Sequence, residues 1–147
     1  MPNFSNYAES GILNFLFRGN SNNFGRPNVL AVALTRNIPA ETDNGQNLPE
    51  LANAGSYARV LLGTPANSLF TDIVQDGSSS GVIDNASAIT FPAATAEWGH
   101  VSGIAITNSG VYGAGEIIVF GRLTTPRHVL SGDTFQINTG DLDILLG

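Results

Sequence analysis

The sequence predicts a mainly β protein, namely a single antiparallel β-sandwich or jelly-roll-like domain with an N-terminal α-helix. Strand-length apolar runs recur from Ile89 to Gly147, and turn-forming residues separate them. Regular short runs with Gly, Asn, Asp and Pro between them are typical of antiparallel sandwiches and barrels. With 147 residues, 42% of them hydrophobic, the chain is long enough to bury one core. We therefore expect an N-terminal helix and arm over 1–28 and a β-sandwich domain over 29–147, together forming one globular unit.

The helix is predicted over residues 3–19. Asn6 or, one position earlier, Ser5 is placed to cap its start, and Gly19 suits the position just after its end. The apolar residues at helical spacing are Ile12, Leu13, Leu16 and Phe17. Gly11 costs about 1 kcal/mol of helix stability relative to Ala, so we expect packing to hold the helix. The helix either packs within its own chain or docks on another subunit.

The β domain is predicted to begin with a buried strand. Residues 29–36 are apolar on both faces, which is typical of a central strand, and 57–62 form the next strand. Two long connections, 37–55 and 63–81, interrupt this half of the chain, and connections of that length are usually functional or mobile. Later strands, closely spaced and therefore expected to be antiparallel neighbours, are predicted at 87–91, 100–107, 115–123, 127–130, 134–138 and 141–146.

The composition excludes several kinds of partner. The formal net charge is −6, and the six cationic residues are arginines scattered singly, so direct nucleic-acid binding is not expected. No run approaches the roughly 20 apolar residues of a membrane-spanning helix, so no membrane is expected either. Cysteine is absent, which removes disulfides and thiolate chemistry. Only 12% of residues are charged, and such a surface loses little solvation when it is buried against a partner.

Two groups of ionisable residues are candidate catalytic sites. Glu97 and His100 resemble a base with its orienting carboxylate, but no nucleophile motif accompanies them. Asp141 and Asp143 share one face of a strand, as in a glycosidase pair or part of a calcium site, although a solvent-facing polar side is the simpler explanation. We therefore expect no catalytic residues, no metal and no cofactor, and we expect that the protein is not an enzyme.

Two further features have simple structural explanations. Gly110, Gly113 and Gly115 lie between two predicted strands with no helix after them, which indicates a hairpin and not a phosphate-binding loop. Trp98 is a possible platform for stacking a sugar, but a core or interface tryptophan is the more ordinary role.

Five segments carry a resemblance to a known family. In chain order they are NFSNYAESGILNFLFRG, VLAVALTR, GSYARV, ITFPAATAEWGHVSGIAI and LTTPRHVLSGDTFQINTGDLDILL. The most specific parts are TFPAATAEWG and SGDTFQINTGDLDI. The arrangement resembles small tailed-bacteriophage (cyanophage-like) virion structural proteins, often labelled tail fibre proteins, some of which are similar to capsid cement proteins. The similarity spans nearly the whole chain.

The resemblance implies a capsid cement or decoration protein. Such a protein is made in the host cytoplasm, lies on the outer capsid surface, and stabilises the assembled shell by binding the major capsid protein and itself as a homodimer or homotrimer. The alternative is a tail-fibre or receptor-binding accessory protein that uses an exposed β face. A third hypothesis, a glycan-active enzyme, would depend on Asp141 and Asp143.

The expected partner-binding residues lie in two segments. The helix and its arm contribute aromatic side chains, and the 37–55 connection contributes two leucines that need burial. These residues are Phe4, Tyr7, Phe15, Phe17, Leu48 and Leu51.

Overall fold

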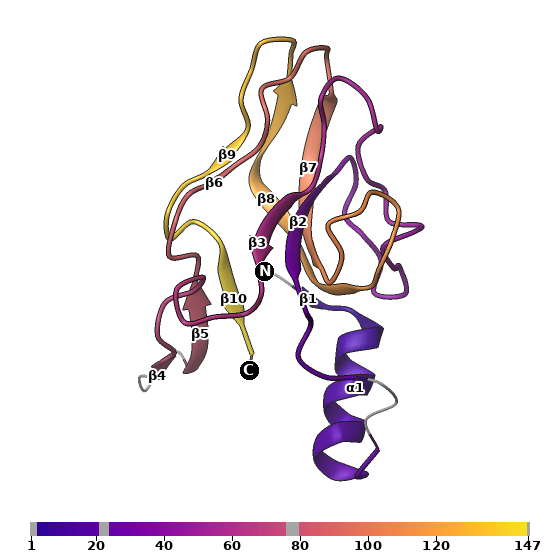
Figure 1. The fold of residues 1–147 in the computed structure, drawn as a ribbon, viewed down its shortest axis with the longest axis vertical. Helices are drawn as coiled ribbons and strands as arrows, with labels where there is room; N and C mark the ends of the chain where they lie inside the picture. Colours follow the sequence, from indigo (N-terminus) through magenta and orange to yellow (C-terminus); the bar gives the residue numbers. More distant parts are fainter. Residues whose placement is uncertain (1–2, 21–23, 76–79, 147) are drawn as a thin grey trace.

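The computed structural model describes residues 3–20, 24–75 and 80–146, which form a β domain with a helix projecting from one end (Figure 1). All the strand pairs among them are antiparallel. The elements are β1 (Asn3–Phe4), α1 (Asn6–Phe17), β2 (Leu30–Thr35), β3 (Val60–Gly63), β4 (Val74–Gln75), β5 (Ser80–Asp84), β6 (Ile89–Thr90), β7 (Gly99–Thr107), β8 (Ile117–Val129), β9 (Gln136–Ile137) and β10 (Asp143–Leu145). The predicted fold class, mainly antiparallel β with an N-terminal helix, is confirmed.

A five-stranded sheet forms the body of the protein, with strand order β1-β8-β7-β2-β3. The predicted central strand is confirmed, because β2 pairs with β3 on one side and with β7 on the other. Strands β7 and β8 form a hairpin through the 108–116 connection, which confirms the hairpin interpretation of the glycines there. The sheet therefore places α1, which follows β1, at one of its edges (Figure 1).

Strand β2 is apolar on both faces because each face contacts a separate core. Successive side chains of a strand point to opposite faces. Val32 and Leu34 belong to the larger core, while Ala33 belongs to a smaller core with Leu48 and Phe120. The side chains that cover the larger core come from the segments around β6, β9 and β10: Ile89, Phe91, Phe135, Ile137 and Leu142. These segments act as the second layer of the sandwich.

The two smaller sheets join segments that are distant in sequence. Strand β9 follows β8 but pairs with β6, and β10 pairs with β5 in a three-stranded sheet of order β10-β5-β4. Chain neighbours in this region are therefore not always sheet neighbours, contrary to the expectation from their short links. The 63–81 connection contributes β4 and the start of β5, and its residues 76–79 lie outside the described part of the chain.

One long strand replaces two predicted ones. The sequence predicted breaks between 115–123 and 127–130, whereas β8 runs from Ile117 to Val129. Val101 faces Arg127 and Gly103 faces Arg122, so a two-residue step along β7 opposes a five-residue step along β8. The extra residues form a bulge that contains Pro126. Proline is tolerated there because a bulged residue need not donate to the ladder.

The 37–55 connection lies against the sheet. The Arg36 amide, just after β2, donates to the carbonyl of Pro49 in the connection at 2.8 Å. The Leu51 amide of the connection donates to the Leu34 carbonyl at 3.1 Å, and Thr35 forms a bridge with Glu50. The connection therefore covers the face of the sheet that carries the smaller core. No helix among the described residues has the length and apolar character needed to cross a membrane.

Candidate functional site

The start of α1 is fixed to the sheet by Ser5. This buried residue is the N-cap, which selects Ser5 over Asn6 among the two predicted caps. Its Oγ accepts a hydrogen bond from the Ala8 amide at 3.2 Å and donates one to the carbonyl of Ile117 on β8. Its own amide donates to the carbonyl of Ile118 at 3.1 Å. The helix therefore leaves the body from a defined point beside β1.

Gly11 explains how the first half of α1 packs. A Cβ atom at Gly11 would lie 2.2 Å from the ring of Phe24, so only glycine lets Phe24 rest on the helix. Tyr7 contacts the same ring edge-to-face, with 5.6 Å between ring centroids. The predicted reliance of the helix on packing is explained by this contact. The helix ends as expected, with Gly19 at a φ of 62° after the C-cap residue Arg18.

The second half of α1 projects from the body and exposes large apolar side chains (Figure 1). Four side chains that would normally be buried are 58–79% exposed; we call them the apolar helix end, and they are Leu13, Phe15, Leu16 and Phe17. Leu13, Leu16 and Phe17 lie at i, i+3 and i+4, on one side of the helix. Four of the ten exposed large apolar residues in the described part of the chain lie within these five positions, 13–17.

A hollow lies beside the apolar helix end. It has a volume of about 310 Å³ and opens to solvent. We call it the aromatic hollow, and its lining residues are Phe15, Phe24, Gly25, Arg26 and Pro27. Phe15 belongs to both features because it follows Ala8 and Gly11 along the body-facing side of the helix. Phe15 thus lines the hollow, while Leu13, Leu16 and Phe17 project from another side of the helix.

The six predicted contact residues fall into three groups. Phe15 and Phe17 are exposed in the apolar helix end. Phe4 packs against the larger core and Tyr7 packs against Phe24, so both are half-buried. The two leucines of the 37–55 connection are buried in the chain's own cores, Leu48 in the smaller and Leu51 in the larger. These leucines satisfy their need for burial within the chain, which leaves the helix as the candidate contact element.

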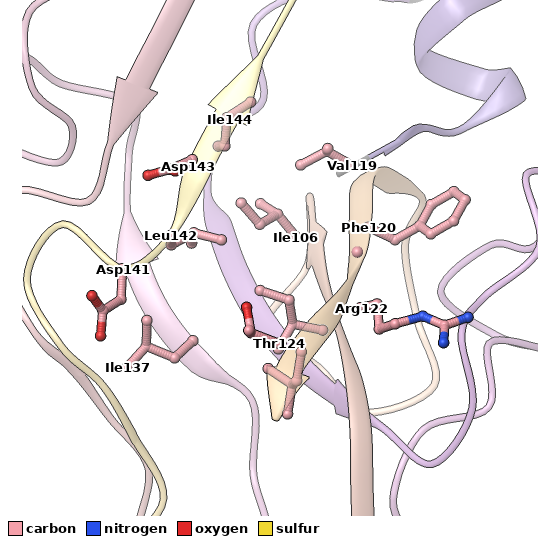
Figure 2. Close-up of a pocket in the computed structure, with 13 residues that line it drawn as sticks. Ile106, Val119, Phe120, Arg122, Thr124, Ile137, Asp141, Leu142, Asp143 and Ile144 are labelled. Carbon is pink, nitrogen blue, oxygen red and sulfur yellow. The ribbon is translucent and has the colours of Figure 1, made fainter. Parts of the chain in front are cut away.

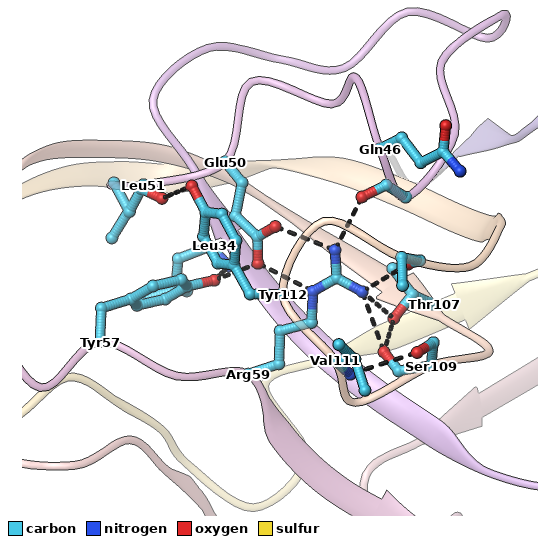
Figure 3. Close-up of polar contacts among 12 residues, drawn as sticks. Leu34, Gln46, Glu50, Leu51, Tyr57, Arg59, Thr107, Ser109, Val111 and Tyr112 are labelled. Carbon is cyan, nitrogen blue, oxygen red and sulfur yellow. Dashed lines mark hydrogen bonds and ion pairs between the residues drawn. The ribbon is translucent and has the colours of Figure 1, made fainter. Parts of the chain in front are cut away.

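A buried ion pair holds the 37–55 connection in place (Figure 3). The Arg59 guanidinium binds both carboxylate oxygens of Glu50, at 2.8 and 2.9 Å. It also donates to the carbonyls of Gly45, Ser109 and Ala114 at 2.8–3.0 Å. Arg59 therefore ties this connection to the β7–β8 turn. Each of these bonds links one segment of the chain to another.

Tyr57 completes this network. Its hydroxyl donates to Glu50 at 2.8 Å and accepts from the Leu34 amide at 3.0 Å. Burial raises the pKa of Tyr57, and the Glu50 carboxylate raises it further, so the phenol remains a donor. Sequence reasoning did not identify this network. The one available signal was Arg59, a charged residue inside the apolar strand run 57–62.

The histidines are arranged differently from the predicted dyad. The Glu97 carboxylate contacts His128 Nε2 and not His100, and both side chains of that pair are largely exposed. His100 and His128 face each other across β7 and β8, with ring centroids 4.7 Å apart. Within residues 3–20, 24–75 and 80–146, no three His, Asp or Glu side chains are grouped as a metal site requires.

An open groove of about 190 Å³ lies between β8 and the β10 segment (Figure 2). Figure 2 shows Ile106 and Leu142 between the two strands, while Phe120 and Arg122 point away from β10. Asp143 hydrogen-bonds Asp84, its cross-strand neighbour, and this contact is the main cause that raises the pKa of the Asp143 carboxyl. The partner of Asp143 is thus Asp84, in a strand ladder, and the groove between the strands is mostly aliphatic.

Trp98 is a core residue, as the simpler interpretation held. Its side chain is buried, its Nε1 donates to the Gly55 carbonyl at 2.7 Å, and its ring meets Tyr57 edge-to-face. It therefore offers no free face for stacking a sugar.

Sequence reasoning missed the residues that complete the helix site. Leu13 and Leu16 were part of the helical pattern but were not assigned to a contact surface. Phe24, Arg26 and Pro27 lie in the part of the predicted N-terminal arm that follows the helix, to which no contact residue was assigned. The signal was present as an aromatic residue and a proline close together in an Asn-rich stretch.

Comparison with protein families gives a match over nearly the whole chain. A family model described as Podophage GP4 fiber I protein gp80 matches residues 3–145, which include the helix, the five-stranded sheet and the second layer. Among curated proteins, none matches this chain. The matched range confirms the resemblance to phage virion structural proteins. The chain therefore belongs to the Podophage GP4 fiber I protein gp80 family and is a structural protein of the phage virion.

Proposed function

We propose that this protein is a non-catalytic subunit of a virion fibre and that α1 attaches it to neighbouring virion proteins. The description of its family as a fibre protein supports the location. The observation that carries the attachment role is the apolar helix end, whose four large side chains are exposed on a projecting helix. A helix of this kind is normally covered by a partner in the assembled particle.

The size of the exposed surface supports this role. With areas of roughly 150–250 Å² per large side chain, the apolar helix end presents on the order of 500 Å² of apolar surface. The largest apolar patch on a typical monomer is about 300–600 Å² and is often functional. Burying it would contribute roughly 10 kcal/mol before the costs of association are subtracted. Those costs are of similar size, so additional contacts or many copies are needed for a stable attachment.

A second candidate function is capsid decoration, in which the protein binds the assembled major-capsid-protein shell from outside. The observation that favours it is compactness: the sequence has no repeat of the kind that builds a fibre shaft, and the longest strand of the described residues has 13 residues. A ligand that binds only the assembled lattice shifts the equilibrium toward that lattice. If the protein is instead a fibre component, the absence of a shaft repeat in its sequence means that it forms a collar, an adaptor or a tip of the fibre.

Antibody-gold labelling of intact virions tests both locations. We expect label confined to the tail and its fibres, with a copy number far below that of the major capsid protein. Label spread evenly over the head, with hundreds of copies, would replace the fibre proposal with capsid decoration. Virions without label would contradict both.

The attachment role of α1 is tested by incorporation. Phage lacking this protein would be complemented with wild-type protein, with Leu16→Asp, or with Ile73→Asp as a matched control. Ile73 is 65% exposed, close to Leu16 at 63%, but lies outside α1. We expect Leu16→Asp to reduce the amount of protein per virion at least tenfold and Ile73→Asp to leave it unchanged. Equal incorporation of the two variants would exclude α1 as the attachment element.

A further inference from the structure

We propose that the groove between β8 and β10 binds an extended segment of another protein, in which apolar and basic residues alternate. The segment adds a strand to the open edge of β10 and places its apolar side chains in the groove. This contact surface is separate from the apolar helix end, so it goes beyond the attachment role of α1.

Strand β10 has backbone groups that can bind a further strand. Among the described residues it pairs only with β5, and it lies at one end of the three-stranded sheet. The Leu142 carbonyl and the Leu146 amide are hydrogen-bonded on the β5 side, at 3.2 and 3.0 Å. Backbone groups alternate in direction along a strand, so those of Asp143 and Leu145 point away from β5. Edges of this kind bind extended peptides through main-chain hydrogen bonds.

The groove offers space for apolar side chains of that strand. Its volume is about 190 Å³, and a second hollow of about 340 Å³ continues it along β8. The two hollows share the lining residues Leu123, Thr124, Ile137 and Asp141. Both volumes are far above the roughly 10–15 Å³ that one water molecule needs. The groove is therefore large enough for side chains and not only for solvent.

The core-facing side of β10 is covered less and less toward its end. Leu142 is buried, Ile144 is half-buried, and Leu146 on the same face is 59% exposed. Figure 2 shows Leu142 between β10 and β8, where an added strand would lie. Apolar residues of that strand would cover Ile144 and Leu146, as neighbouring residues on one face of a sheet do.

The opposite face of β10 favours basic residues. Asp143 lies directly across from Asp84, and like charges in that position are unfavourable. The hydrogen bond with Asp84 is the main cause that raises the pKa of Asp143, and the charges of Asp84 and Asp141 raise it further. A Lys or Arg across from Asp143 on the added strand would supply the missing positive charge. Because successive residues face opposite sides of a sheet, the added strand must alternate apolar and basic residues.

A second copy of this chain does not provide such a strand. The sequence contains no lysine, and no two of its six arginines are two positions apart. Two basic residues therefore never follow each other on one face of a strand, since that requires a spacing of two. The occupant is accordingly a segment of a different protein.

Fluorescence anisotropy with synthetic peptides tests the proposal. The probe is a labelled peptide of alternating valine and lysine, about six residues long, which is the usual length of a strand. The control peptide alternates valine and glutamate. We expect saturable binding of the valine–lysine peptide and binding at least about tenfold weaker for the control, because its charges are repelled. Absence of binding, or equal binding of the two peptides, would overturn the proposal.

Two variants test the place of binding. Asp143→Lys should weaken binding of the valine–lysine peptide by about tenfold or more. Glu41→Lys makes the same change of charge at an exposed residue outside the groove and should leave binding unchanged. Leu145→Pro should also weaken binding, because proline removes an outward-pointing amide that an edge strand can spare. Circular dichroism checks that the variants are folded, and equal binding by all of them would contradict the assigned edge.

Amide hydrogen exchange of the wild-type protein gives a test that does not depend on any variant. Saturating valine–lysine peptide should slow the exchange of the Asp143 and Leu145 amides, since both become hydrogen-bonded. The Val32 amide in the central strand β2 should not change. Unchanged exchange at Asp143 and Leu145 with the peptide bound would overturn the addition of a strand to β10.

Discussion

Among the described side chains, the Arg59 guanidinium has a distinctive role because it joins three separate segments. It neutralises a buried carboxylate and satisfies carbonyls from the 37–55 connection and from the β7–β8 turn (Figure 3). Buried ion pairs contribute little net stability when both partners are present, because desolvation offsets the attraction. Removing one partner is costly, because the other charge stays buried and unpaired.

We therefore predict that Arg59→Met destabilises the protein by about 3–5 kcal/mol, as measured by urea unfolding. The unpaired Glu50 carboxylate and the unsatisfied carbonyls cause the loss. Arg122→Met is the control, since Arg122 is exposed and its side chain points away from β10 (Figure 2), and a change within about 0.5 kcal/mol is expected there. Similar losses for the two variants would mean that the network contributes nothing specific.

Asp143 gives a prediction with a defined pH dependence. Its contact with Asp84 raises its pKa above the ordinary 3.8, so the folded state favours the protonated form. The stabilising contribution is therefore complete below pH 3.8 and is lost as the pH rises through the raised pKa. At neutral pH the two carboxylates repel each other across β5 and β10.

We predict that Asp143→Asn is more stable than wild type at pH 7 by a few tenths of a kcal/mol, because the pair is exposed and screened. The difference should decrease as the pH is lowered toward 4. Unfolding curves at the two pH values measure it, with Asp72→Asn, an exposed carboxylate away from this pair, as the control. A larger difference at pH 4 than at pH 7 would contradict the assigned direction.

At the scale of the elements, α1 is held by its contact with Phe24 more than by its intrinsic propensity. Gly11→Ala gains about 1 kcal/mol of propensity, yet its new Cβ would lie 2.2 Å from the Phe24 ring. We predict a net destabilisation of about 1–2 kcal/mol because overpacking usually costs more than the gain. Thermal unfolding would be compared with Ser10→Ala, an exposed neighbour expected to be neutral or slightly stabilising. Stabilisation by Gly11→Ala would show that Phe24 moves away freely.

The elements also show which parts of the fold the sequence could predict. The strand β2 was predictable because a run that is apolar on both faces has no stable place except between two cores. The continuity of β8 was not predictable, since Pro126 normally ends a strand and only the bulge opposite β7 accommodates it. The pairings of β9 and β10 were not predictable either. Their partners β6 and β5 lie more than 40 residues away, and local patterns contain no information on such contacts.

For the whole molecule, stability should decrease from the centre of the sheet toward α1. Strand β2 is flanked by hydrogen-bonded neighbours and two cores, whereas the second half of α1 contacts little of its own chain. We predict that native-state hydrogen exchange is slowest in β2 and β7 and fastest at the end of α1. Uniform protection across the chain would contradict this gradient.

The site was only partly predictable for a related reason. The aromatic residues of the helix could be identified as contact candidates from their number and spacing. Leu48 and Leu51 looked equally available, but they are buried because the Arg59 network folds the 37–55 connection onto the sheet. The aromatic hollow depends on Phe24 returning to Gly11 after the helix ends. The local sequence specifies neither the folding of the 37–55 connection onto the sheet nor the packing of Phe24 against Gly11.

The way α1 joins the body also has a mechanical consequence. On its N-terminal side, α1 is tied to the sheet by Ser5 and by the two residues of β1, which pair with Phe120 and Val119 of β8. On its C-terminal side, the chain leads to the central strand β2. Strand β8, in contrast, is held to β7 along most of its length. Under tension the short link would separate first, and the sheet behind it would stay folded and able to rejoin. Release of β1 would leave the helix attached to the intact sheet through the segment that leads to β2.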